Sequence, residues 1–250
     1  MNIFRTFWKA LRELFEELLI LSIANFLWIG MNILAIGALL LTWSGGASGL
    51  FLLALLLSAI SFGPANAGLY TIAQRVTEGR TSSWRDFFAG VRAYAQLSWK
   101  VYGLWLLGLA IILFNLQFYN LNGSQFAALI SILFLYFLMV WFGMLIYIGP
   151  LMLLQTDKRI RTIARNAALM AFGRPLFTIG TLVLMAIITV TSIWLPILLL
   201  VLTAAFLALW GFRATLTLIA EAEARRERLA EKNAETQAPK GRGGQVRPRE

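Results

Sequence analysis

The 250-residue chain contains neither cysteine nor histidine. Without cysteine it has no disulfide and no thiolate metal ligand. Without histidine it lacks the commonest metal ligand and the usual carrier of protons near neutral pH. These absences exclude most templates for metal-dependent and nucleophilic catalysis, so we expect no catalytic residues, no cofactor and no enzymatic activity.

Charged residues are also scarce. They make up 14% of the chain against 59% hydrophobic residues, and the mean hydropathy is +0.74. Three long stretches, 18–74, 101–156 and 175–212, contain no Asp, Glu, Lys or Arg. A transmembrane helix needs roughly 20 apolar residues, so each stretch can hold two. The sequence predicts an all-α fold, a polytopic transmembrane bundle of about six spans.

A cluster of turn-forming residues divides each of the three stretches. The clusters are 44–49, 120–124 and 191–196, and in the last of them Pro196 can begin a helix because the first turn lacks N–H partners anyway. The predicted spans are 18–43, 50–74, 101–119, 125–155, 176–193 and 196–219.

Basic residues gather at alternate ends of the predicted spans. They fill the segments 75–100 and 158–174 and flank both ends of the chain, whereas the turns near 45, 122 and 194 carry no charge. The positive-inside rule then places both termini in the cytoplasm. Topology and attraction to anionic lipid headgroups account for the net charge of +10, and no nucleic-acid partner is expected, because no basic stripe alternates with aromatics.

Amphipathic segments accompany the basic regions. Residues 1–17 have an aromatic and aliphatic stripe opposite charged residues, which predicts a helix lying on the inner leaflet, although a partner-binding role is an alternative. Further interfacial helices are predicted at about 83–98 and 157–172. The first begins with a capping-box pattern, and its cytoplasmic interface comprises Trp84, Arg85, Phe87, Phe88 and Arg92.

The chain ends in a charged cytoplasmic tail, 221–250. The tail is predicted to continue the last span as a helix and to be disordered after residue 236, where apolar residues become too few to compensate for ordering.

Two predicted spans contain a Gly-Pro pair, Gly63-Pro64 and Gly149-Pro150. Proline interrupts the hydrogen-bond ladder one turn back, and the freed carbonyl needs a partner inside the bundle. Interruptions at matching places can mark a transporter substrate site, or they can be packing kinks. Asn25 and Asn66, at comparable depth, could likewise bind a hydroxylated ligand or join helices.

Three segments together carry a resemblance to a known family: Asn-Phe-Leu-Trp at 25–28, Gly-Pro-Ala-Asn-Ala-Gly-Leu-Tyr at 63–70 and Trp-Arg-Asp-Phe-Phe-Ala-Gly at 84–90. They resemble the YesL family of bacterial membrane proteins over about residues 15–220. Asn66 stands where that family more often has Thr, and 28–63 is longer. The resemblance implies a multi-pass protein of the bacterial plasma (inner) membrane, of a kind often encoded beside carbohydrate uptake or degradation systems.

We therefore predict a non-catalytic accessory or assembly component of a bacterial membrane system, with carbohydrate transport as the suggested context. Its expected partners are the lipid bilayer and another membrane protein such as a transporter subunit, while the oligomeric state is left open. The alternative is a self-contained transporter or channel for a small neutral solute. That alternative requires a cavity lined by Asn25, Asn66 and the backbone at Pro64 and Pro150. No ionisable side chain is expected within the spans, which disfavours proton-driven transport.

Overall fold

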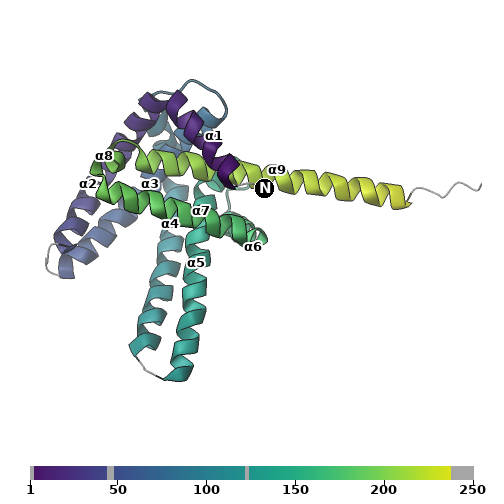
Figure 1. Ribbon diagram of the computed structural model, residues 1–250. Helices are drawn as coiled ribbons and strands as arrows, with labels where there is room; N and C mark the ends of the chain where they lie inside the picture. The colour runs from purple at the N-terminus through teal and green to yellow at the C-terminus, as the bar shows by residue number, and fades with distance from the viewer. Residues whose placement is uncertain (1–2, 44–47, 122–123, 238–250) are drawn as a thin grey trace, which may run out of the picture. The chain divides into compact units, whose positions relative to one another are not determined.

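A computed structural model describes residues 3–43, 48–121 and 124–237, and all regular structure in these ranges is helical (Figure 1). The chain divides into two compact units, one ending at Thr215 and one beginning at Leu216. The elements are α1 (Ile3–Glu16), α2 (Leu18–Trp43), α3 (Ser48–Thr77), α4 (Trp84–Leu121), α5 (Gln125–Leu154), α6 (Ile160–Gly173), α7 (Pro175–Trp194), α8 (Pro196–Leu198), a π-helical segment η1 (Leu199–Thr203) and α9 (Ala204–Gln237).

Five helical stretches among the described residues are long and apolar enough to cross a membrane: Leu18–Ala38, Trp84–Asn120, Gln125–Leu154, Pro175–Trp194 and Pro196–Asn233. The predicted all-α, multi-pass architecture is therefore confirmed. The remaining predicted span, 50–74, coincides with α3, although the side chains of residues 50–56 and 59 lie outside those described.

The predicted turns separate the helices within each hairpin. α2 ends and α3 begins on either side of residues 44–47, which lie outside the described residues. Before α5, the side chain of Ser124 caps the helix by accepting a hydrogen bond from the Ala127 N–H at 3.1 Å. Only Leu195 separates α7 from α8, and Pro196 begins α8 as predicted.

The prediction for the segment 83–98 requires a correction. It was predicted as an interfacial helix separate from the span 101–119, but the two are one continuous helix, α4, of 38 residues. No glycine, proline or polar turn cluster interrupts 98–101, so the backbone ladder continues. The counterpart at 157–172 does form a separate helix, α6, which begins at Ile160 because residues 155–159 are not helical.

The N-terminal helix α1 divides its apolar stripe between two environments. The ring of Phe7 packs edge-on against Phe206 and Trp210 of α9, with centroid distances of 5.9 and 5.1 Å. Phe4 and Trp8, on the other edge of the stripe, are each 69% exposed. One edge thus attaches α1 to the bundle, and the other is left exposed.

The expectation that no span contains an ionisable group is wrong, because Arg213 lies within the predicted span 196–219. It forms an ion pair with Glu13 of α1, and it donates a hydrogen bond to the backbone oxygen of Thr77 at 3.1 Å. The two side chains are only 12% and 15% exposed, so pairing and hydrogen bonding compensate for their loss of water. This cluster ties α1 and the end of α3 to α9.

Two tryptophans join the helices of the second hairpin, α4 and α5. The indole N–H of Trp105 donates to the backbone oxygen of Trp141 at 3.0 Å, and the indole N–H of Trp141 donates to the backbone oxygen of Trp105 at 2.9 Å.

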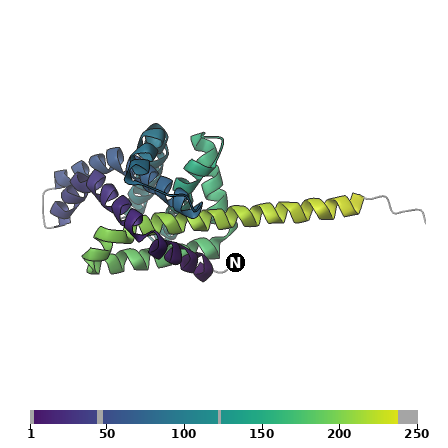
Figure 2. The same ribbon diagram turned by 90° about the horizontal axis from the view of Figure 1, so that it is seen from above.

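In Figures 1 and 2, α7 and the start of α9 run side by side and cross the α4–α5 hairpin steeply. The hairpins therefore diverge from a common region instead of packing in parallel.

Candidate functional site

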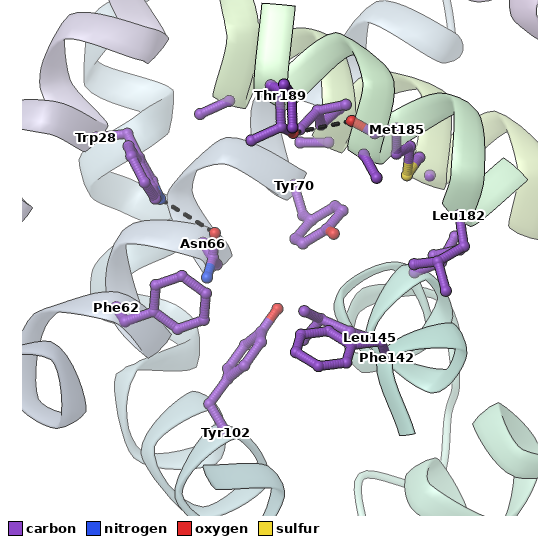
Figure 3. Close-up of a pocket in the computed structure, with 17 residues that line it drawn as sticks. Trp28, Phe62, Asn66, Tyr70, Tyr102, Phe142, Leu145, Leu182, Met185 and Thr189 are labelled. Carbon is purple, nitrogen blue, oxygen red and sulfur yellow. Dashed lines mark hydrogen bonds between the residues drawn. The ribbon is translucent and has the colours of Figure 1, made fainter. Parts of the chain in front are cut away.

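A cavity of about 450 Å³ lies where helices α2, α3, α4, α5, α7 and α9 meet (Figure 3). Its walls are mostly aromatic and aliphatic, and none of its lining residues is Asp, Glu, Lys or Arg. The volume falls within the range of roughly 300–1,000 Å³ typical of small-molecule sites. The cavity is therefore the candidate functional site.

Asn66 supplies the first polar group of the cavity, from the second half of α3. Its side-chain oxygen accepts a hydrogen bond from the indole N–H of Trp28 at 3.1 Å. That bond fixes the amide so that its nitrogen faces the open space, as Figure 3 shows. No hydrogen bond joins this nitrogen to another described residue.

Two tyrosines supply further polar groups. Tyr70 follows Asn66 by one turn of α3, and Tyr102 reaches the cavity from α4, with its hydroxyl turned toward the centre (Figure 3). The side chains are 9% and 2% exposed, and neither hydroxyl bonds to another described residue. Buried phenolic hydroxyls normally find a partner, so these two are available to a molecule in the cavity.

Aromatic packing holds the polar groups in place. The ring of Phe62 packs edge-on against Trp28 and Tyr102, with centroid distances of 6.4 and 5.5 Å. On the other side, Gly149 of α5 lets the Tyr70 ring lie against its backbone, because a Cβ there would stand 1.9 Å from the ring. The site is thus preformed by rigid side chains on helices.

Asn25, predicted to pair functionally with Asn66, does not line the cavity. Its amide nitrogen donates to the backbone oxygens of Leu199 and Leu200 at 3.0 and 2.6 Å, and its oxygen accepts from the Ala205 N–H at 3.1 Å. These are backbone groups in and beside η1, where the widened helix leaves the normal ladder. The fully buried Asn25 therefore joins helices. This was the alternative to ligand binding in the sequence analysis.

The Gly-Pro pairs are packed against neighbouring helices. Pro64 removes the normal partner of the Ile60 carbonyl, and the indole N–H of Trp99 on α4 donates to that oxygen at 2.6 Å. Gly63 allows the close approach, since a Cβ there would lie 3.1 Å from the Ser98 backbone. Pro150 similarly affects the Ile146 carbonyl, which faces Gly211 of α9.

The predicted cytoplasmic interface is only partly exposed. Phe87 is fully buried against Gly68, where a Cβ would stand 2.8 Å from its ring, so it belongs to the packing between α3 and α4. Trp84 is exposed, packs edge-on with Phe88 and has the Arg85 guanidinium 5.4 Å from its ring centroid. Arg92 is also exposed. The predicted surface is thus reduced to four of its five residues.

Sequence reasoning found Asn66 but missed the two tyrosines. A usable signal was present, because a tyrosine deep in an apolar stretch needs a partner for its hydroxyl. The polar groups of the cavity can bind a molecule through hydrogen bonds. Within the described ranges, no three carboxylates gather as a metal ion would require. Comparisons of the chain with protein-family models, curated proteins and solved structures found no match.

Proposed function

We propose that this chain is a non-catalytic multi-pass membrane protein that binds a small, uncharged, mostly apolar molecule and serves as an accessory component of a membrane system. The observation that carries the proposal is the convergence of the Asn66 amide nitrogen with the Tyr70 and Tyr102 hydroxyls in one apolar cavity. These groups all donate hydrogen bonds. The matching ligand carries an oxygen acceptor, such as a carbonyl, ether or hydroxyl group.

The polar groups of the cavity carry an energetic cost when nothing occupies it. A buried donor without a partner costs about 1–3 kcal/mol, and hydrocarbon offers no replacement. The Tyr102 ring packs against Phe62, and Phe62 packs against Trp28, the hydrogen-bond partner of Asn66. Binding of a ligand with one or two oxygens recovers this cost, while its apolar part fills the remaining space.

A self-contained transporter or channel for a small neutral solute is the second candidate. The cavity between the hairpins favours a transporter or channel. The site predicted for such a protein, at the proline-broken helices, is instead packed against neighbouring helices. Asn25, Gly63 and Pro64 are buried, and none of them lines the cavity. Liposomes containing the protein should therefore retain trapped neutral solutes such as glucose as well as empty liposomes do.

The cellular setting of the proposal is the bacterial plasma membrane, with both termini in the cytoplasm. Its support is the distribution of basic residues and the resemblance of residues 25–28, 63–70 and 84–90 to the YesL family. In this setting the accessory role is beside a carbohydrate transporter. Isolation in mild detergent followed by mass spectrometry should recover a transporter subunit, and a protein that is always isolated alone would contradict the role.

The binding proposal is tested by extracting small molecules from the purified protein and identifying them by mass spectrometry. We expect one class of uncharged, oxygen-containing apolar molecule at close to one per chain. Asn66→Leu removes a donor, and Ala204→Phe fills the cavity, so both should reduce its recovery about tenfold or more. Ala110→Phe adds the same volume on the exposed face of α4 and serves as the control. Equal recovery from all four proteins would refute the site.

A further inference from the structure

A second pocket, of about 660 Å³, lies between α4 and the connection from α5 to α6, and none of its lining residues lines the central cavity. Three basic side chains line it: Lys100 from α4, and Lys158 and Arg159 from the connection. Tyr94 and Leu97 form part of its wall. The pocket therefore combines concentrated positive charge with an apolar surface.

We propose that this pocket binds the phosphate of an anionic phospholipid, with Lys100 and Arg159 as its charged contacts. Basic pockets between helices at the cytoplasmic boundary of a membrane are suited to anionic lipid headgroups. The proposal is independent of the ligand proposed for the central cavity.

Lys158 gives the pocket a fixed positive charge. Its ammonium group donates to the backbone oxygens of Met152 and Leu153, both at 2.9 Å, and lies 5.5 Å from the centroid of the Tyr94 ring. It thereby caps the end of α5, where unpaired carbonyls favour a cation. Partial burial lowers the pKa of Lys158 below its ordinary value.

Arg159 and Lys100 have more freedom to meet a ligand. Lys100 is exposed, and Arg159 is 86% exposed with only Asp157 nearby, at 3.8 Å. The Asp157 carboxylate is engaged elsewhere, because it accepts hydrogen bonds from the Thr162 hydroxyl at 2.8 Å and the Arg159 backbone N–H at 3.1 Å. The local balance is therefore positive, with three cations against one carboxylate.

The surface next to Lys100 argues for a lipid in preference to a free phosphate. Leu104, Leu107 and Ile111 follow Lys100 at spacings of four, seven and eleven residues, so they share its face of α4, and each is about half exposed. The neighbouring Trp99 is 47% exposed, as is typical of the aromatic belt at a membrane boundary. An acyl chain can lie along this face while its phosphate occupies the pocket.

The test uses the full chain in detergent, titrated with phosphatidylglycerol, phosphatidylcholine or inorganic phosphate and monitored by native mass spectrometry. We expect one phosphatidylglycerol to bind in preference to the other two. Lys100→Gln with Arg159→Gln should weaken its binding about thirtyfold, from about 1 kcal/mol per basic group. Lys158 is left unchanged because it caps α5.

The control removes the same charge outside the pocket, with Arg92→Gln and Arg161→Gln, both exposed. It should retain binding within about threefold, since only the long-range attraction is lost. If both double variants weakened lipid binding equally, net charge alone would explain the binding and the proposed site would be overturned. If inorganic phosphate bound as tightly as phosphatidylglycerol, the assignment of the pocket to a lipid would be overturned. Circular dichroism of each variant establishes that it is folded. Lys100→Glu alone changes the charge by the same two units and provides a second variant with a similar expected loss.

Discussion

The two Gly-Pro pairs, in α3 and α5, have the same sequence but different surroundings. At Pro64 the freed carbonyl of Ile60 receives a hydrogen bond from Trp99, and the junction with α4 is closed. At Pro150 the corresponding carbonyl, of Ile146, faces Gly211, where an added Cβ would lie 3.3 Å away, and both residues border the cavity. One motif therefore closes a helix junction in the first hairpin, whereas in the second its freed carbonyl belongs to a residue that lines the cavity.

The largest effect is expected for Gly63→Leu, which tests the closed side of the comparison. Even a Cβ at this position would lie 3.1 Å from the Ser98 backbone, and a backbone cannot move aside as a side chain can. The helices α3 and α4 must then separate, at a cost of about 3 kcal/mol. Thermal unfolding in detergent measures the loss. Gly103→Leu is the matched control, because nothing lies within 4 Å of Gly103, and it should leave the unfolding temperature nearly unchanged.

Gly149→Ala tests the cavity side. The new methyl group would stand 1.9 Å from the Tyr70 ring, which lines the cavity and would have to shift. We expect ligand recovery to fall about tenfold, equivalent to about 1.4 kcal/mol, with a smaller loss of stability than in Gly63→Leu. Gly63→Ala should show the opposite pattern, with lowered stability and unchanged recovery. If both substitutions acted alike on binding, the proposed difference between the two pairs would be incorrect.

The helical hairpins could be predicted because their signal is local. Uncharged stretches, turn clusters and Pro196 each determine a boundary within a few residues of sequence. The junction between 83–98 and 101–119 was harder, because polarity changes there while the helical ladder does not. Amphipathic patterning reports which solvent a face meets, and it does not report whether the backbone bends.

The candidate site depends on contacts between distant parts of the chain, which single-segment patterns do not contain. Asn25 and Asn66 have the same residue type and similar predicted depth, yet one bonds to η1 and the other faces the cavity. Glu13 and Arg213 likewise meet across 200 residues. Their roles follow from which helices pack together, and that arrangement emerges only from the complete bundle.

A smaller effect is expected for Trp99→Phe, which keeps the ring but removes the donor to the Ile60 carbonyl. The loss of stability should be about 1 kcal/mol, the usual net value of one hydrogen bond. Pro64→Ala restores an N–H one turn from that carbonyl, so Trp99→Phe should cost much less in its background. A double-mutant cycle of unfolding free energies measures this coupling. Additive effects would show that Trp99 does not compensate for Pro64.

The smallest effect is expected for Pro150→Ala. The restored N–H gives the Ile146 carbonyl a helical partner worth about 1 kcal/mol, while loss of the buried proline ring removes a similar amount of packing. The net change in unfolding free energy should therefore be under about 1 kcal/mol. In the double variant Pro150→Ala with Trp99→Phe, the two changes in unfolding free energy should add within about 0.5 kcal/mol, since Trp99 bonds to α3 and not to α5. Coupling as strong as that of Pro64→Ala would mean that the two prolines act through one shared network, and the distinction between the closed junction and the cavity would fail.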